Sequence, residues 1–209
     1  FLITYLLIKE KKMTGRIHVV NFYIRRILRI WPLFYAVVIF GLVVYPQLKL
    51  LLGGEQFKIV HPWSYLVFLN NFDFLHHGAP AMISILWSVA IEEQFYLCWP
   101  LILSLVPLKR FKFVFWTIIA GCMVFRIFNA HDERVLMFHT LAVIGDMALG
   151  GLCAYYVIFS NRFQNWLTGL PGWFIKLMYL LTAAIVLFRK DIFPGGWMVL
   201  ERIVFASLF

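Results

Sequence analysis

Long runs of apolar residues constrain the fold of this chain more than any other feature. A helix needs about 20 mostly apolar residues to cross a hydrocarbon core ~30 Å thick, and five stretches approach or exceed that length. Charged residues make up 14% of the chain and hydrophobic residues 63%, whereas a soluble domain carries about 25% charged residues. The sequence therefore predicts an all-α, polytopic helical membrane bundle with at least five transmembrane helices. The predicted spans are Pro32 to Leu52, Ile83 to Leu108, Phe113 to Asn129, Leu136 to Phe159 and Trp173 to Phe188.

The sequence contains no sign of a domain boundary. No Gly/Ser-rich linker, low-complexity tract or internal repeat interrupts it, so we expect one integral-membrane domain over residues 1–209. The apolar runs are continuous and lack the period-two alternation of a barrel strand. Because the chain opens and closes within apolar residues, we interpret it as a domain truncated at both ends, with further helices expected on either side.

The net charge of +9 could suggest binding to nucleic acid, but the positions of the basic residues are typical of a membrane protein. Basic residues gather between Lys9 and Arg29 and again near Lys109. If these segments are cytoplasmic, the positive-inside rule is satisfied and residues 53–82 lie outside. Within that outer segment, Tyr65 to Phe74 is too short to span, so it is expected to lie along the interface or to re-enter.

Two adjacent carboxylates, Glu92 and Glu93, interrupt the second predicted span. An ionised acid in a membrane helix costs roughly 2.5–3.5 kcal/mol on insertion scales, which makes it a functional-site hypothesis. Ser88 and Tyr96 lie four residues before and after Glu92 and share its helical face. This favours Glu92 over Glu93 as the functional acid. The alternative is a buried ion pair that only holds helices together.

A second polar feature is the run of arginines Arg25, Arg26 and Arg29, which precedes the first predicted span. Residues three and four apart lie on one helical face, and the guanidinium group suits phosphate. The cluster predicts a cytoplasmic site for a phosphorylated substrate such as acyl-CoA. Binding of anionic lipid head groups is an equally ordinary role for it. Pro32 fits the first turn of the helix that follows.

Other polar residues in apolar surroundings give weaker signals. Asp146 is an intramembrane acid, and His139 lies seven residues before it on nearly the same helical face; this pair predicts either a second part of a polar cavity or a helix-to-helix contact. No metal site is expected, because His61 and the pair His76-His77 lack a helical carboxylate partner. The three cysteines lie singly in apolar runs and indicate no metal or redox chemistry.

Two motifs in this order and spacing resemble acyltransferase family three, a family of integral-membrane O-acyltransferases found mostly in bacteria. The first is Arg25-Arg26-x-x-Arg29-Ile30-x-Pro32. The second is Trp87-Ser88-Val89-x-x-Glu92-x-x-Phe95-Tyr96-Leu97-x-Trp99-Pro100. The loop from Glu10 to Ile17 and the stretch Leu69-Asn70-Asn71-Phe72 also resemble the family.

The resemblance implies transfer of an acyl group, commonly acetyl from acetyl-CoA, to a hydroxyl of a cell-surface or secreted carbohydrate. It implies a multi-pass protein of the bacterial cytoplasmic membrane, with acyl-CoA as co-substrate and no other cofactor. In the family a histidine on the first membrane helix is the proposed general base; here it is expected upstream of Phe1. Glu92 would be the catalytic carboxylate that orients this histidine, as the acid of a triad does. Arg25, Arg26, Arg29, Ser88, Tyr96 and Asp146 are the predicted substrate-binding residues.

Two other classes of protein fit the same residues. A transporter or flippase for a glycan or lipid-linked intermediate would use the intramembrane acids and the arginines as a relay, although such proteins often show internal repeats. A membrane scaffold or sensor would tolerate substitution at both motifs.

Overall fold

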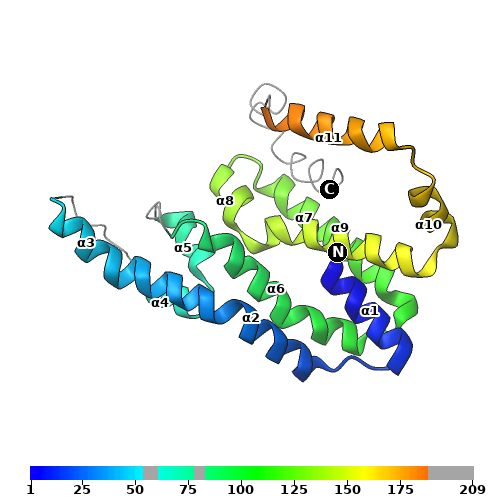
Figure 1. The fold of residues 1–209 in the computed structure, drawn as a ribbon, viewed down its shortest axis with the longest axis horizontal. Coiled ribbons are helices and arrows are strands. Elements are labelled where there is room, and N and C mark those ends of the chain that lie inside the picture. The colour runs from blue at the N-terminus through cyan, green and yellow to red at the C-terminus, as the bar shows by residue number, and fades with distance from the viewer. Residues whose placement is uncertain (54–60, 78–82, 188–209) are drawn as a thin grey trace. The chain divides into compact units, whose positions relative to one another are not determined.

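A computed structural model describes residues 1–53, 61–77 and 83–187, and these residues form helices and connecting segments without any strand. The prediction of an all-α fold is therefore confirmed. The described residues divide into two compact units (Figure 1). The first contains Phe1–Ile17, Leu103–Met137 and residues from Leu141 onward, and the second contains His18–Ile102 and Phe138–Thr140. The prediction of one domain over residues 1–209 stays a prediction.

One long helical stretch dominates the second unit. It joins α2 (Val19–Ile39), the π-helix η1 (Phe40–Val44) and α3 (Tyr45–Leu51) into 33 continuous residues. The predicted span began at Pro32, but this proline lies inside α2 and the helix starts thirteen residues earlier. Proline is tolerated inside membrane helices because neighbouring groups satisfy the carbonyl that it leaves unpaired. The arginines consequently lie on the membrane helix itself, not before it.

The other elements of the second unit pack against this stretch. They are α4 (Trp63–Leu66), α5 (Asn70–His76) and most of α6 (Leu86–Leu105), which continues into the first unit from Leu103. The segment from Trp63 to His76 forms the two short helices α4 and α5, and its location along the interface or in a re-entrant loop stays a prediction. Between them Phe68 adopts a φ of 56°, in the left-handed region. A core of aromatic and aliphatic side chains fills the unit, including Phe34, Val38, Tyr65, Phe74 and Ile83.

The first unit contains the remaining helices. They are α1 (Leu2–Thr14), the 3-10 turn η2 (Leu108–Arg110), α7 (Phe111–Phe128), α8 (Glu133–Phe138), α9 (Thr140–Phe159), α10 (Asn161–Thr168) and α11 (Gly172–Leu187).

Two basic side chains stabilise the first unit through backbone carbonyl groups. The ammonium group of Lys11 donates to the carbonyls of Leu103, Ser104 and Val106 at 2.6–2.8 Å, which caps the C-terminal end of α6. Arg126, 1% exposed in α7, donates to the carbonyls of Leu136 and Ala142. A buried arginine requires such acceptors. Sequence reasoning did not single out either of these structural roles.

Three helical stretches among the described residues are long and apolar enough to cross a membrane, namely Val19–Leu51, Leu108–Phe128 and Glu133–Phe159. The pair Asn161–Thr168 and Gly172–Ile185, bent by 85°, would make a fourth if it counts as one span. The prediction of at least five is not confirmed. Helix α6 is not among them, because Glu92, Glu93 and Gln94 lower its average hydropathy. Phe188, the last residue of the fifth predicted span, lies outside the described residues.

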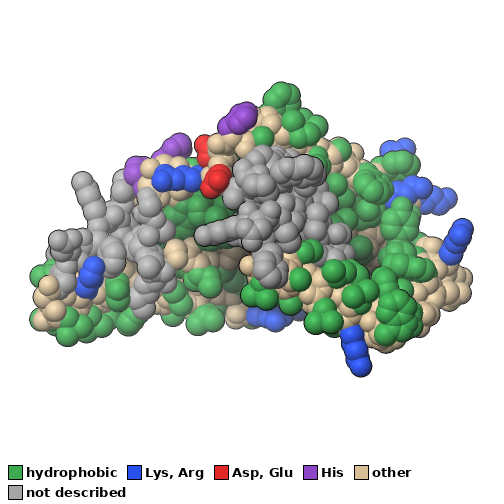
Figure 2. Space-filling model, turned by 90° about the horizontal axis from the view of Figure 1, so that it is seen from above, with side chains coloured by type: hydrophobic (Ala, Val, Ile, Leu, Met, Phe, Trp, Pro, Cys, Tyr) green, Lys and Arg blue, Asp and Glu red, His purple; other side chains and the backbone are tan. Residues whose placement is uncertain are grey.

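The surface of the described residues carries many large apolar side chains. Figure 2 shows such side chains in several patches of the visible face. Leu33, Val43, Leu101, Phe113 and Trp116 are each roughly half exposed or more. Water-exposed surfaces of this kind are rare in soluble proteins. Together with the three apolar helical stretches, this composition indicates a membrane protein.

Candidate active site

The predicted arginines all lie on the N-terminal half of α2, but they face in different directions. Arg25 and Arg29 are exposed and one helical turn apart, as their spacing predicted. Arg26 turns toward α6, where its guanidinium carbon lies 5.5 Å from the centre of the Tyr96 ring and 5.5 Å from that of Phe22. Two arginines are thus available to a ligand, whereas the third packs between α2 and α6.

The predicted face of α6 is formed in part. The Tyr96 hydroxyl donates to Oε2 of Glu92 at 3.1 Å, as residues four apart on a helix can. The Ser88 hydroxyl instead donates to the carbonyl of Ile85 at 3.0 Å, within its own helical turn. Ser88 therefore lies on this face, while its hydroxyl proton is directed at the backbone. Glu92 is exposed and accessible to a ligand.

Glu93 occupies a different environment from Glu92. Its side chain is 3% exposed, and its Oε2 accepts a 2.9 Å hydrogen bond from the indole Nε1 of Trp31 on α2. Its Oε1 is buried and has no hydrogen-bond partner among the described residues, and the same is true of Nε of Arg26. Buried polar atoms without partners are uncommon.

These contacts join the two helices that carry the two sequence motifs. Arg26 and Trp31 on α2 meet Tyr96 and Glu93 on α6, and Arg26 lies close enough to Glu93 for their opposite charges to interact. Figure 1 shows α2 running alongside α6 in this region. We refer to Arg26, Trp31, Glu92, Glu93 and Tyr96 as the α2–α6 cluster.

The chemistry of the α2–α6 cluster follows from its surroundings. Packed Phe22, Phe95 and Trp99 are each at most 5% exposed and exclude water from its base. Charges interact more strongly where water is excluded. A carboxylate in such a place can orient a histidine or hold a hydroxyl, and a guanidinium can hold an anion. The cluster thus combines an exposed carboxylate, Glu92, with a guanidinium, Arg26, that is packed between the helices.

A buried amide network next to the motif was not predicted. Gln94 donates to the carbonyl of Phe68 at 2.7 Å and to Oδ1 of Asn71 at 2.8 Å, and the Thr140 hydroxyl donates to Oε1 of Gln94 at 2.5 Å. Asn71 also donates to the carbonyl of Phe138. Asn70 is 0% exposed, and neither polar atom of its amide has a partner among the described residues. In the sequence, the adjacent asparagines Asn70 and Asn71 within an apolar stretch could have indicated this network.

Asp146 lies on α9 in the first unit, whereas the arginines, Ser88, Glu92 and Tyr96 lie in the second. His139 lies in a one-residue break, because α8 ends at Phe138 and α9 begins at Thr140, and it packs its ring against Phe72 at 5.2 Å. The predicted alignment of Asp146 with His139 stays a prediction.

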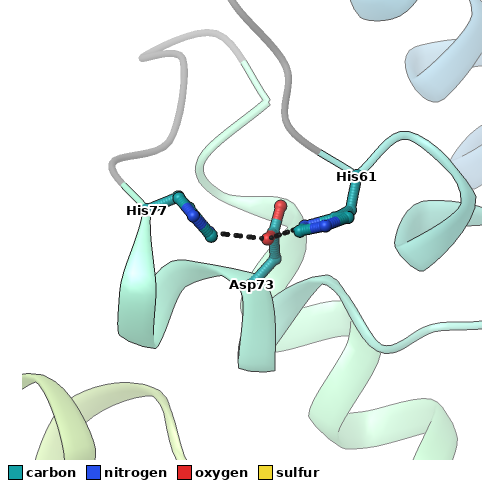
Figure 3. A group of neighbouring side chains, drawn as sticks. All are labelled: His61, Asp73 and His77. Carbon is teal, nitrogen blue, oxygen red and sulfur yellow. Dashed lines mark hydrogen bonds and ion pairs between the residues drawn. The ribbon is translucent and has the colours of Figure 1, made fainter.

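The histidines of the outer segment do have a helical carboxylate partner, contrary to expectation. Nδ1 of His61 lies 2.9 Å from Oδ1 of Asp73, and Nδ1 of His77 lies 3.1 Å from the same oxygen (Figure 3). Asp73 lies in the first turn of α5. Burial, followed by the charge of Asp73, raises the pKa of the nearby phenol Tyr65 to about 12. His76, the neighbour of His77, does not belong to this group.

The fold and the α2–α6 cluster define a helical membrane protein with charged residues set between apolar helices. Over 170 residues, covering 74% of the chain, the sequence is 32% identical to O-acetyltransferase OatA of Staphylococcus aureus (strain NCTC 8325 / PS 47). It is also 32% identical over 173 residues to SACOL0978 of Staphylococcus aureus (strain COL), which is provisionally named an O-acetyltransferase. The chain is thus a homologue of O-acetyltransferases, which confirms the resemblance to acyltransferase family three.

These similarities have a defined extent. The chain spans 28% of the length of the curated relatives it matches. No protein-family model matches the chain, and no solved structure matches it. The names of the relatives support an acyltransferase enzyme, as the motifs predicted.

Proposed function

We propose that the protein is a membrane O-acyltransferase that moves an acyl group, most simply acetyl, from acyl-CoA to a hydroxyl of a cell-surface or secreted carbohydrate. The observation that carries the proposal is the 32% identity to O-acetyltransferases over 74% of the chain. We further propose a multi-pass location in the bacterial cytoplasmic membrane, with acyl-CoA as co-substrate and no other cofactor.

The exposed pair Arg25 and Arg29 is the proposed site for the phosphates of acyl-CoA. From Val19 to Leu51 the helical stretch would rise about 48 Å, which is longer than a hydrocarbon core of ~30 Å, so the stretch extends beyond the core. Arg25 and Arg29 lie toward its N-terminal end. The positive-inside rule puts this end in the cytoplasm, where acyl-CoA is available.

The carboxylate of Glu92 is the proposed partner of the general base. A histidine of the kind that the family resemblance implies as general base would take the proton from the acceptor hydroxyl as its oxygen attacks the thioester carbonyl carbon. The new C–O bond forms, the C–S bond breaks, and the leaving thiolate receives the proton to give free CoA. Glu92 would hold the histidine in the right tautomer, and the hydroxyl of Tyr96 holds Glu92 through its 3.1 Å hydrogen bond.

Helix α6 is the proposed additional membrane crossing. Its 20 residues rise about 30 Å, enough to cross the hydrocarbon core. Glu92, Glu93 and Gln94 make it more polar than an ordinary span, as an active-site helix would be. With α6 and the bent pair of α10 and α11, the number of crossings would reach the predicted five.

The test measures acyl transfer by the full-length protein in nanodiscs, with radiolabelled acetyl-CoA and cell-surface glycan from its host. Glu92→Gln should lower the rate by at least about a hundredfold without changing the thermal midpoint. Glu133→Gln is the matched control, because Glu133 is an exposed acid in the first turn of α8, and it should leave transfer unchanged. Near-normal transfer by Glu92→Gln would remove Glu92 from the mechanism. Movement of intact substrate across the bilayer without transfer of label would favour the transporter.

A further inference from the structure

Two histidines from different segments converge on one carboxylate at the outer end of the second unit. His61 precedes α4, Asp73 lies on α5, and His77 follows directly after α5. Figure 3 shows both imidazole rings directed at the same oxygen of Asp73. We refer to His61, Asp73 and His77 as the His–Asp–His group. It takes no part in the proposed acyl transfer.

The separations within the group resemble those imposed by a single small ion. One ligand atom from each residue can be chosen so that all three lie within 4.8 Å of one another. With metal–ligand bonds of about 2.0–2.1 Å, two ligands of a tetrahedral zinc ion lie roughly 3.3 Å apart. The two nitrogen-to-oxygen distances, 2.9 and 3.1 Å, are already close to this value. Only the two imidazole nitrogens need to approach each other.

The exposure of the side chains permits that movement and leaves room for a further ligand. The carboxylate of Asp73 is 10% exposed and fixed, whereas the side chains of His61 and His77 are 45% and 41% exposed. The rings therefore can rotate, and solvent can reach the position opposite Asp73. A site with three protein ligands and one open position is the arrangement of zinc sites that retain a bound water.

We propose that the His–Asp–His group binds one divalent transition-metal ion of the zinc class, with water as the fourth ligand. Two imidazole nitrogens and one carboxylate suit Zn²⁺ and its neighbours in the first row. Mg²⁺ and Ca²⁺ are excluded as the preferred ions because they favour oxygen ligands. The ion would tie the segment before α4 to α5.

A bound ion would also rigidify the buried amide network. Asn71 lies two residues before Asp73 on α5 and accepts a hydrogen bond from Gln94 of α6. Fixing Asp73 and His61 around an ion would restrict the turn at Phe68, whose carbonyl also accepts from Gln94. Binding to the folded state alone raises its stability, so zinc is expected to raise the thermal midpoint of the protein.

The test is zinc binding to the full-length protein, purified in detergent through an affinity tag without histidine and stripped with EDTA. Isothermal titration with ZnCl₂ should give one equivalent for the wild type, with affinity at least about tenfold weaker in His61→Ala and in His77→Ala. The neighbouring variant His76→Ala is the matched control and should bind as the wild type does. Zinc should raise the thermal midpoint of the wild type and of His76→Ala only.

A spectroscopic measurement distinguishes the site from loose surface binding. Co²⁺ bound to the wild type should show the intense visible absorption of a four-coordinate ion, and this absorption should disappear in Asp73→Asn. If Asp73→Asn fails to fold, the His61→Gln and His77→Gln variants, checked by their thermal midpoints in EDTA, take its place. Equal zinc affinity in the wild type and in a His61→Ala/His77→Ala double variant would overturn the proposal, as would a wild type that binds no zinc equivalent.

Discussion

The indole of Trp31 donates a 2.9 Å hydrogen bond to Oε2 of Glu93, joining α2 to α6 across 62 residues of sequence. This bond separates the roles of the two adjacent carboxylates. Glu93 is 3% exposed and held by α2, whereas Glu92 is exposed and bonded only to Tyr96 among the contacts described for it. The acid that a ligand can reach is therefore Glu92.

Trp31→Phe should destabilise the protein while keeping the aromatic ring. The substitution leaves both oxygens of Glu93 without a donor, and an unsatisfied buried acceptor costs about 1–3 kcal/mol. The thermal midpoint in detergent should fall. Trp116→Phe is the control, because Trp116 is 52% exposed on α7. An unchanged midpoint for Trp31→Phe would mean that the hydrogen bond contributes nothing to stability.

Tyr96→Phe should slow acyl transfer by at least about tenfold. The ring stays beside Arg26, so the cation–π contact at 5.5 Å is kept, but the hydroxyl that donates to Glu92 is removed. Net loss of one hydrogen bond to a charged group corresponds to about 1.5–3 kcal/mol. Initial rates with labelled acetyl-CoA measure the effect. Tyr179→Phe, at a site 69% exposed on α11, should transfer at the wild-type rate. Equal rates for the two variants would argue against a role for the hydroxyl.

Substitutions of the arginines of α2 should have two different kinds of effect, one on acyl-CoA binding and one on stability. Arg25→Ala/Arg29→Ala should weaken acyl-CoA binding by at least about tenfold at an unchanged thermal midpoint, because both side chains are exposed. Arg26→Ala should also lower the midpoint, since it removes a cation–π contact worth about 0.5–2 kcal/mol.

The control for this series is Arg162→Ala, which removes one exposed positive charge from α10. Binding of CoA and of anionic-lipid vesicles is measured for each variant. Unchanged CoA affinity in Arg25→Ala/Arg29→Ala, with weaker vesicle binding, would assign these residues to lipid head groups instead.

Gly41→Ala should destabilise the second unit. A Cβ added at Gly41 would clash with Cγ2 of Ile83, which is 0% exposed. Overpacking of this kind costs about 1–3 kcal/mol. The π-helix η1 places Gly41 against Ile83, so the contact is specific to this turn.

Two further variants isolate the contact between Gly41 and Ile83. Gly121→Ala is the control, because an added Cβ there meets nothing within 4 Å. In an Ile83→Ala background, which lacks Cγ2, the substitution Gly41→Ala should lower the thermal midpoint much less than it does alone. A full effect in that background would attribute the loss to the helix backbone and not to the clash.

The sequence by itself determined the helical class and the relationship to O-acetyltransferases. Long apolar runs satisfy their backbone hydrogen bonds in a membrane only as helices, so length and composition sufficed. The contact between Glu92 and Tyr96 could also be predicted, because a spacing of four fixes neighbours on a helix. The apolar run misplaced the start of the first span, because the helix begins at Val19 and continues through Pro32.

Only the tertiary structure decided which partners the polar residues have across the fold. The sequence of α6 has apolar residues on every face of the helix, so it does not show which face packs against α2. The structure shows that Glu93, not Glu92, turns toward Trp31. The approach of His61 to Asp73 brings the segment before α4 against α5. Such contacts join residues far apart in sequence, and the rotation and packing of whole helices set them, which local spacing does not encode.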